Sequence, residues 1–364
     1  MKQAIEASFS SLSLYGNILP FKKLIEGIFN SLSRRPTVFP ISINLLLTRK
    51  CNYACRMCVS SKLEKAHGEE KEDVDLPAIK EFIHAVRRHQ PVFHIGGGEP
   101  FMRKDLLEIV SFIKQSGLKC LVTTNGFLMD EQALKGLKGL VDVLIISLYG
   151  PREIHDKVVG VEGAFDKTVD HLKFLVKNKR KDMRVMVSCI AMPESLGSFQ
   201  TFLAYLQSLG VDAVKIEHLN FLTSKEHAAR TVSDSEGNDF DLTPTIFIDD
   251  QSFQERFVQE LVRLRKEILR FAIPVRIKPY LTDQQIQDWY LSLPQRDHEC
   301  RFITHSVFVN YNGDIIPCQF LTHCVLGNIK KDSLEDVWHS ELYQKLRRTI
   351  KKTHLKVCMR CCKN

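Results

Sequence analysis

Short apolar runs alternate with amphipathic stretches through the first two thirds of the chain. The strand-like apolar runs lie at 41–47, 92–95, 120–124, 141–148, 185–191 and 211–219. The stretches with helical spacing of apolar residues lie at 76–86, 105–115, 130–137, 165–177 and 198–209. Strand–helix units joined by right-handed crossovers predict an α/β fold, a partial (β/α)6 TIM-like barrel around a curved parallel sheet.

Three segments flank this barrel core, which we place at 41–222. Residues 1–40 carry an apolar stripe with basic neighbours, which predicts an amphipathic helix that packs on the barrel. Contact of this helix with an anionic membrane or a partner protein is the alternative. Residues 223–299 are expected to form an acidic loop and a linker helix, and residues 300–364 a small cysteine-rich domain.

The C-terminal segment has its own strand and helix signals. Two apolar runs, 307–311 and 314–316, flank Asn312-Gly313, and this dipeptide predicts a hairpin with a two-residue turn. A single helix is expected from about 333 to 350.

Composition is typical of an intracellular protein. The chain has 364 residues and 44% hydrophobic content, enough for one large core and a smaller second domain. No apolar run has transmembrane length and no secretory leader begins at Met1, so we expect a soluble cytoplasmic protein. In such a reducing compartment its 11 cysteines favour metal ligation over disulfides. The net charge of +8 comes largely from a basic tail helix, which is expected to be solvated.

Three cysteines directly after the first predicted strand have the spacing C-x3-C-x2-C. They are Cys51, Cys55 and Cys58. Three thiolates can hold three irons of a 4Fe-4S cluster and leave the fourth iron open to a small molecule. A zinc-binding loop is the alternative.

The turn after the second predicted strand carries a second motif that helps to interpret these cysteines. It reads Gly97-Gly98-Glu99-Pro100, and with the cysteine motif it resembles the radical S-adenosylmethionine (SAM) superfamily. The resemblance implies that Cys51, Cys55 and Cys58 bind a 4Fe-4S cluster on which SAM is cleaved. It also implies that the two glycines let the backbone approach SAM and that Glu99 receives its amino group.

The resemblance extends to further SAM-contacting positions. Met57 stands where the family usually has an aromatic residue near the adenine. Asn125 and Ser147 lie at strand ends that converge on the same edge of the sheet, and Ser147 is expected to contact the ribose. Tyr149 occupies a position where many relatives carry an acidic residue. His94 could reach the site, but a packed strand histidine is the simpler interpretation, so no general base is assigned.

Four more cysteines form a second group in the tail. Cys300 and Cys318 bracket the predicted hairpin, and Cys358 and Cys361 form a C-x2-C pair. This arrangement resembles the twitch domain, a shortened SPASM domain, and implies one fully ligated auxiliary 4Fe-4S cluster. Structural zinc is the alternative.

Two cysteines remain outside these assignments in the tail. Cys324 or Cys362 could replace one of the four predicted ligands, and the sequence leaves this open.

The two resemblances together imply a radical SAM oxidoreductase or modifying enzyme. It would cleave SAM reductively to a 5′-deoxyadenosyl radical that abstracts hydrogen from a peptide or small-molecule substrate. An external flavodoxin or ferredoxin would supply electrons, and the auxiliary cluster would transfer them. The alternative is a non-catalytic iron-sulfur or zinc carrier or sensor that retains the fold.

Overall fold

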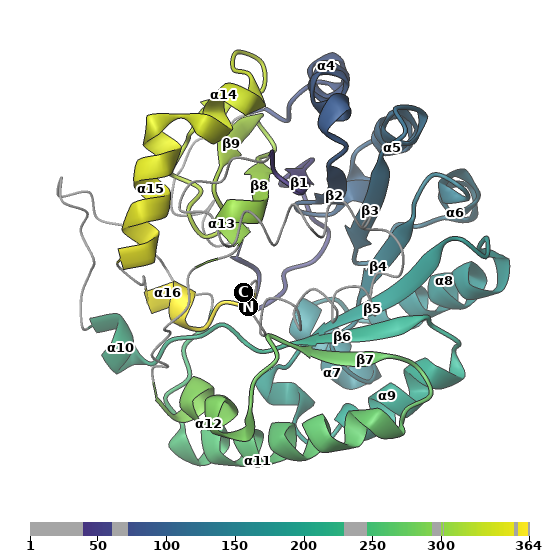
Figure 1. Cartoon of the computed structure of the whole chain (residues 1–364). Helices are drawn as coiled ribbons and strands as arrows, with labels where there is room; N and C mark the ends of the chain where they lie inside the picture. The colour runs from purple at the N-terminus through teal and green to yellow at the C-terminus, as the bar shows by residue number, and fades with distance from the viewer. Residues whose placement is uncertain are drawn as a thin grey trace.

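A single curved sheet surrounded by helices organises the molecule (Figure 1). The computed structural model describes residues 39–59, 72–228, 246–292, 300, 302–352 and 356–362. The predicted N-terminal helix within 1–38 and the centre of the acidic loop, 229–245, lie outside the described residues.

The sheet has ten strands in the order β10-β9-β8-β1-β2-β3-β4-β5-β6-β7. The strands are β1 (Ser42–Leu46), β2 (Val92–Gly96), β3 (Lys119–Thr124), β4 (Val143–Ser147), β5 (Arg184–Ile190), β6 (Ala213–Glu217), β7 (Val275–Lys278), β8 (Ser306–Val309), β9 (Asp314–Ile316) and β10 (Gly327–Asn328). All six strands predicted for the barrel are present, and each pairs in parallel with the next. The predicted partial TIM-like barrel is therefore confirmed.

Helices follow the strands and cover the outer face of the sheet (Figure 1). The α-helices are α4 (Leu76–Val86), α5 (Leu106–Gln115), α6 (Glu131–Leu137), α7 (Arg152–Val159), α8 (Ala164–Asn178), α9 (Phe199–Ser208), α10 (Ser224–Ala228), α11 (Gln251–Glu267), α12 (Asp283–Leu291), α13 (Phe302–His305), α14 (Leu334–His339), α15 (Glu341–Lys352) and α16 (Lys356–Met359). The 3-10 helices are η2 (Arg87–His89), η3 (Pro100–Met102), η4 (Pro193–Ser195) and η5 (Ile268–Arg270).

Side-chain caps explain where two of the predicted helices begin. Asp75 accepts a hydrogen bond from the Ala78 amide at the start of α4, and Asp130 accepts one from the Ala133 amide at the start of α6. Each cap satisfies an amide that has no partner within its helix. Helix α7 was not predicted, although Gly160, with φ of 72°, ends it in the left-handed conformation that glycine favours.

The region expected to hold only an acidic loop and linker helix also contributes a strand. Strand β7 pairs in parallel with β6 and extends the barrel, and α12 follows it. The prediction missed β7 because it has only four residues, whose alternation is too brief to stand out.

The cysteine-rich tail shares the barrel sheet. Strand β8 pairs in parallel with β1, with Ser42 opposite Ser306 and Leu45 opposite Val309. In Figure 1 the tail strands β8 and β9 lie at the opposite end of the sheet from β7. The predicted C-terminal domain is therefore attached to the barrel by main-chain hydrogen bonds.

Two details of the tail differ from the prediction. The hairpin loop has three residues, 311–313, because the Asn310 amide bonds the Asp314 carbonyl at 2.7 Å and Gly313 has φ of 89°. A left-handed glycine at the end of a three-residue loop restores the strand direction. The single helix predicted at 333–350 is two helices, α14 and α15, which are separated at Ser340.

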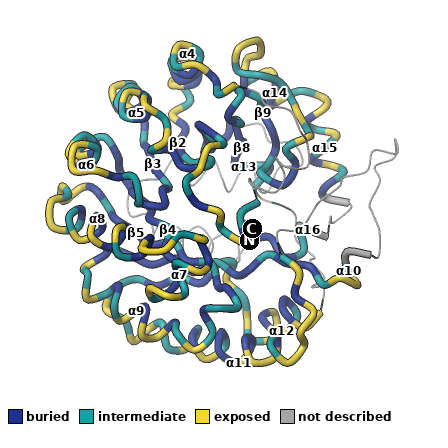
Figure 2. The backbone as a smooth tube through the Cα atoms, turned by 180° about the vertical axis from the view of Figure 1, so that it is seen from behind, coloured by how far each residue is buried: buried dark blue, intermediate teal, exposed yellow. Residues whose placement is uncertain are grey.

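Two apolar cores lie on the two faces of the sheet. The larger core fills the space between sheet and helices, and Figure 2 shows buried strands inside helices whose outer faces are exposed. The smaller core lies inside the barrel and comprises Val92, Leu121, Val143, Ile145, Met186 and Ala213. Closer to the carboxyl ends of the strands than this small core, several inward-facing residues are polar. They include His94, Thr123, Ser188 and Lys215. The barrel interior is thus apolar at one end and polar at the end where ligands bind.

Candidate active site

The cysteine loop that follows β1 is fixed by the end of α7. The Ala54 amide bonds the Val159 carbonyl at 3.0 Å, and the Arg56 amide bonds the Val158 carbonyl at 3.1 Å. The Arg56 guanidinium also pairs with Glu194. These contacts hold the loop at the carboxyl edge of the sheet.

The three thiols of this loop lie close enough to influence one another. Burial raises the pKa of Cys55 to about 12, and the neighbouring Cys58 and Cys51 add to the rise. Burial also raises the pKa of Cys51, although the Tyr53 amide, 3.4 Å from its sulfur, opposes this. A bound cation reverses such a shift because it deprotonates the thiols that coordinate it. Three thiols on one loop, with Cys51 exposed and Cys55 and Cys58 partly buried, fit the corner of an iron-sulfur cluster.

The Gly97-Gly98 turn packs against the backbone of the cysteine loop. A Cβ on Gly97, whose φ is 121°, would lie 2.5 Å from the Thr48 carbonyl oxygen, and a Cβ on Gly98 would overlap the Lys50 carbonyl oxygen. The Gly98 amide bonds the Thr48 carbonyl at 2.7 Å. The glycines therefore permit close approach to the chain's own backbone, in addition to any ligand contact.

Glu99 is buried and already hydrogen-bonded in this structure. Its side chain accepts bonds from the Thr124 hydroxyl at 2.7 Å, the Asn125 amide at 2.7 Å and the Phe101 amide at 3.0 Å. Burial raises its pKa, and these three bonds oppose the rise. A carboxylate has about four acceptor positions, so one remains for a further donor. Pro100 continues the turn and is buried at the start of η3.

Three other residues predicted to bind the cofactor, Asn125, Met57 and Ser147, each have a different environment. The Asn125 amide group bonds Asn52 at 2.8 Å and interacts with the Cys51 thiol, so it lies at the cluster loop. Met57 is buried in the large core behind the loop. Ser147 lies beside the phenol of Tyr149.

Tyr149 is a site residue to which the sequence analysis gave no role. Burial raises the pKa of its phenol, and the nearby Cys55 and Cys58 thiols add to the rise. Its ring stacks on His155 with centroids 5.8 Å apart, and its amide bonds Nδ1 of His155 at 3.2 Å. Burial lowers the pKa of His155 to about 4, so this ring is neutral near pH 7. The signal in the sequence was the departure from an acidic residue at position 149.

The four predicted tail cysteines also lie together. Burial raises the pKa of Cys318 strongly, and Cys358, Cys300 and Cys361 all contribute to the rise. These thiols surround a small apolar cluster that includes Phe320 and Leu321. They therefore fit a second cluster site.

The two additional tail cysteines are separated by the structure. Cys324 packs against the same apolar cluster as the four predicted ligands. The sulfur of Cys362 lies 3.5 Å from Glu217, at the end of β6, so it faces the barrel.

Arg360, within the C-x2-C pair, attaches the tail to the barrel. Only 1% of its surface is exposed. It forms two hydrogen bonds with Glu226, at 2.7 and 2.9 Å, and bonds the carbonyls of Trp289, Phe221 and Ser292. These contacts position Cys358 and Cys361 at the side of the barrel formed by β6 and α12.

Among the described residues, no three or more Cys, His, Asp or Glu side chains converge on the position of one metal ion.

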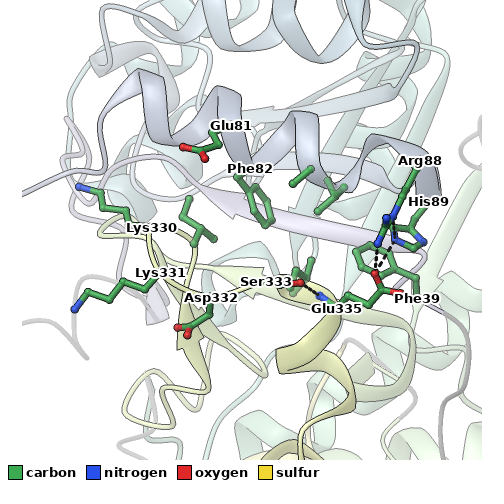
Figure 3. Close-up of a pocket in the computed structure, with 14 residues that line it drawn as sticks. Phe39, Glu81, Phe82, Arg88, His89, Lys330, Lys331, Asp332, Ser333 and Glu335 are labelled. Atoms are coloured by element: carbon green, nitrogen blue, oxygen red, sulfur yellow. Dashed lines mark hydrogen bonds and ion pairs between the residues drawn. The ribbon is translucent and has the colours of Figure 1, made fainter.

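A cavity of about 430 Å³ opens away from the thiols, between α4 and the segment that leads into α14 (Figure 3). Figure 3 shows Arg88 and His89 directed toward Glu335, and Arg88 forms an ion pair with it. Phe39 stacks on His89 with centroids 3.9 Å apart. The cavity therefore marks a contact between the barrel and the tail.

Comparison with known families covers the two regions that contain the cysteine groups. The model of the Radical SAM superfamily matches residues 45–206, and the SPASM model, an iron-sulfur cluster-binding domain, matches residues 300–362. Residues 45–206 therefore form a Radical SAM domain. The tail is a SPASM domain. SAM, a 4Fe-4S cluster and an auxiliary iron-sulfur cluster follow as its cofactors, and the corresponding predictions are confirmed.

Proteins that are similar to this chain have several different names. This radical SAM protein is 34% identical to Fe-coproporphyrin III synthase of Methanosarcina barkeri over 121 residues, which are 33% of this chain and 30% of that protein. It is 24% identical to AdoMet-dependent heme synthase of the same organism over 316 residues, 83% of each chain. The structure of Streptococcus suis SuiB bound to precursor peptide SuiA has a TM-score of 0.61 at 14% identity, covering 94% of this chain and 74% of that one. The last similarity establishes the fold alone.

None of the helices that the structure describes in this radical SAM protein has the length and apolar character needed to span a membrane.

Proposed function

We propose that this protein is an enzyme that cleaves SAM reductively to a 5′-deoxyadenosyl radical and uses it to abstract hydrogen from a substrate. The observation that carries the proposal is the attachment of Glu99 to the cysteine loop, on one edge of the sheet. The Glu99 amide bonds the carbonyl of Lys50, directly before Cys51, at 2.8 Å, so the predicted cluster loop and the predicted SAM ligand lie close together.

The chain's own residues would hold and shield the reactants. Cys51, Cys55 and Cys58 would ligate the 4Fe-4S cluster, which when reduced supplies the electron for SAM cleavage. Glu99 would accept a hydrogen bond from the SAM amino group at its remaining acceptor position. Tyr149, which lies near Cys55 and Cys58, would exclude water from the radical.

Further SAM contacts are assigned to residues at the same edge of the sheet. Asn125 and Ser147 would bind polar groups of SAM. Gly97, Gly98 and Pro100 would shape the turn that presents Glu99. Met57 would support the cluster loop from the apolar core behind it.

The tail would transfer electrons. Cys300, Cys318, Cys358 and Cys361 would ligate a complete auxiliary 4Fe-4S cluster, which leaves no iron open to substrate. A flavodoxin or ferredoxin would reduce the protein. We propose that the protein lies in the cytoplasm.

The substrate is a small molecule or a peptide. Similarity to proteins named Fe-coproporphyrin III synthase and AdoMet-dependent heme synthase supports a tetrapyrrole-type small molecule. The fold shared with a peptide-bound structure is compatible with a peptide substrate.

The decisive experiment measures 5′-deoxyadenosine formed from SAM by the anaerobic, dithionite-reduced protein. Wild type should form it, and replacing Cys51, Cys55 and Cys58 together with Ala should abolish it. That triple variant should retain about four irons against about eight in wild type, because the two sites share no ligand.

The same experiment tests the alternative that this protein is a non-catalytic carrier or sensor. Fully iron-loaded wild type that forms no 5′-deoxyadenosine would support that alternative. A Cys120→Ala variant serves as the control, since Cys120 is buried in β3 and outside both groups. It should keep both the iron content and the cleavage.

A further inference from the structure

Helix α15 of the tail contains a buried arginine. Arg347 is only 7% exposed, and an arginine is almost never buried to this extent unless its charge is paired. Its Nε donates a hydrogen bond to the Ile303 carbonyl at 3.1 Å, and its Nη1 donates one to the Trp338 carbonyl at 2.8 Å. Both acceptors are neutral, so they orient the guanidinium without cancelling its positive charge.

Two aromatic rings enclose the same guanidinium. Its central carbon lies 3.6 Å from the centroid of the Tyr343 ring and 4.1 Å from that of the Trp338 ring. The faces of aromatic rings attract cations, but the rings carry no net charge. Burial lowers the pKa of Arg347, which shows that these contacts replace only part of the stabilisation that water gives to the cation.

The part of the chain that the structure describes offers Arg347 no acidic partner. Of the titratable groups there, Tyr343 alone affects the pKa of Arg347, and Nη2 of Arg347 is buried without a hydrogen-bond partner. Burial of an unpaired charge is costly, and buried charges in folded proteins are normally paired. Among the described residues, Arg347 therefore has both an uncompensated charge and an unsatisfied donor.

The auxiliary cysteines lie next to this cation. Burial raises the pKa of the Tyr343 phenol, and the nearby Cys318 and Cys300 thiols add to the rise. These thiols are therefore close to the ring on which Arg347 stacks. Ile303, whose carbonyl accepts the bond from Arg347, belongs to the small apolar cluster that the tail thiols surround. Two independent contacts thus place the guanidinium beside the predicted cluster site.

We propose that Arg347 is the counter-charge of the auxiliary cluster and raises its reduction potential. The proposal rests on the proposed function, in which four thiolates of the tail ligate that cluster. A cluster held by four thiolates is an anion, and it becomes more negative when it accepts an electron. A nearby buried cation favours the reduced form, because opposite charges attract more strongly inside a protein than in water. Arg347 would thus promote electron transfer to the tail without ligating iron.

The test measures the midpoint potential of the auxiliary cluster by an anaerobic redox titration followed by electron paramagnetic resonance. The reference is the full chain with Cys51, Cys55 and Cys58 replaced by Ala, because only the auxiliary cluster contributes to its signal. In this background, Arg347→Met removes the charge and keeps a long apolar side chain between the rings. It should lower the equilibrium constant for reduction about tenfold, a shift of about 59 mV to a more negative potential.

Two further variants separate the charge of Arg347 from its packing and from the net charge of the protein. Arg347→Lys keeps the positive charge but loses the planar fork that bonds two carbonyls, so it should retain most of the potential. Arg348→Gln removes an exposed charge at the next position of α15 and should leave the potential unchanged, because solvent and salt screen exposed charges. All variants are compared at equal iron content.

Three outcomes would overturn the proposal. They are an unchanged potential in Arg347→Met, an equal shift in Arg347→Lys, and an equal shift in Arg348→Gln. If Arg347→Met does not retain the auxiliary iron, retention of iron by Arg347→Lys would support the proposal, and its loss there would overturn it. The titration contains no SAM, so wild type that forms no 5′-deoxyadenosine would contradict the proposed function and leave this result intact.

Discussion

At the scale of single residues, Glu99 combines a structural and a proposed ligand-binding role. Its carboxylate connects the turn after β2 to Thr124 and Asn125 at the end of β3. Removal of the Glu99 carboxylate would leave these buried donors without an acceptor, which costs about 1–3 kcal/mol. The sequence motif indicated only the ligand role.

We therefore expect Glu99→Ala to have two effects. It should weaken SAM binding while preserving the iron content, because the carboxylate does not contact iron in the proposed site. It should also lower the free energy of unfolding by about 1–3 kcal/mol. Equilibrium dialysis with SAM and urea unfolding measure the two effects, with Glu81→Ala on the exposed face of α4 as the control. Unchanged SAM affinity would assign the amino group to another residue.

Two buried histidines should make the stability of the protein dependent on pH. Burial lowers the pKa of His218 to about 3 and that of His155 to about 4, whereas an unfolded histidine has a pKa of about 6.5. Above pH 6.5 both states are neutral and stability is unaffected. Below it only the unfolded state gains protons, so the free energy of unfolding falls by about 1.4 kcal/mol per histidine for each pH unit until the folded pKa is reached.

Urea unfolding at pH 7.5 and 5.5 under anaerobic conditions tests this effect. His218→Asn removes one of the two groups but retains an acceptor for the Tyr290 hydroxyl, 3.2 Å from Nδ1 of His218. This variant should lose about 1.4 kcal/mol of the pH dependence. His84→Asn, at an exposed position of α4, should retain all of it. Equal pH dependence in wild type and His218→Asn would contradict the assignment.

At the scale of elements, short irregular segments position the reactive loops. The end of α7 holds the cysteine loop through two main-chain hydrogen bonds. The segment around Arg360 attaches the C-x2-C pair to α10 and α12. Burial disfavours the ionised form of Glu226, but its bonds with Arg360 outweigh this and lower its pKa.

Replacing Arg360 with Gln should therefore affect both stability and the auxiliary cluster. Removal of one partner of a buried ion pair costs about 3–5 kcal/mol. The iron of the tail should also become easier to remove by chelators, because Cys358 and Cys361 lose their attachment to the barrel. Urea unfolding and chelator-dependent iron loss measure these effects. The control is Arg180→Gln, which removes an exposed pair with Asp182 and should leave the unfolding midpoint and the iron retention unchanged.

At the scale of the whole molecule, barrel and tail form one sheet. Strand β8 covers the edge of β1, and the contact around Phe39 and Glu335 joins the same two parts on the outside. An uncovered edge strand exposes unpaired amides and carbonyls and promotes aggregation.

A chain that ends at residue 299 should consequently fail to fold as a stable barrel. We expect it to be insoluble or to unfold without a cooperative transition in urea. Co-expression of residues 300–364 should restore solubility, because β8 could then pair with β1. A monomeric 1–299 fragment with the unfolding midpoint of the full chain would show that the tail is an independent domain.

The strand–helix alternation, the two groups of cysteines and the turn that contains Glu99 can be identified without coordinates. The alternation, the C-x3-C-x2-C motif, the C-x2-C pair and the Glu99 turn are local, since period and spacing within about ten residues encode them. Cys300 and Cys318 were assigned to the same group as the C-x2-C pair through the resemblance to the twitch domain. Three features are visible only in the folded chain: β8 pairs with β1, Tyr149 lies near the cluster thiols, and Arg276 and Lys278 face the barrel interior. Such contacts depend on strand register and long-range packing, because main-chain pairing carries little sequence information and residues as distant as Ser42 and Ser306 meet only in the folded sheet.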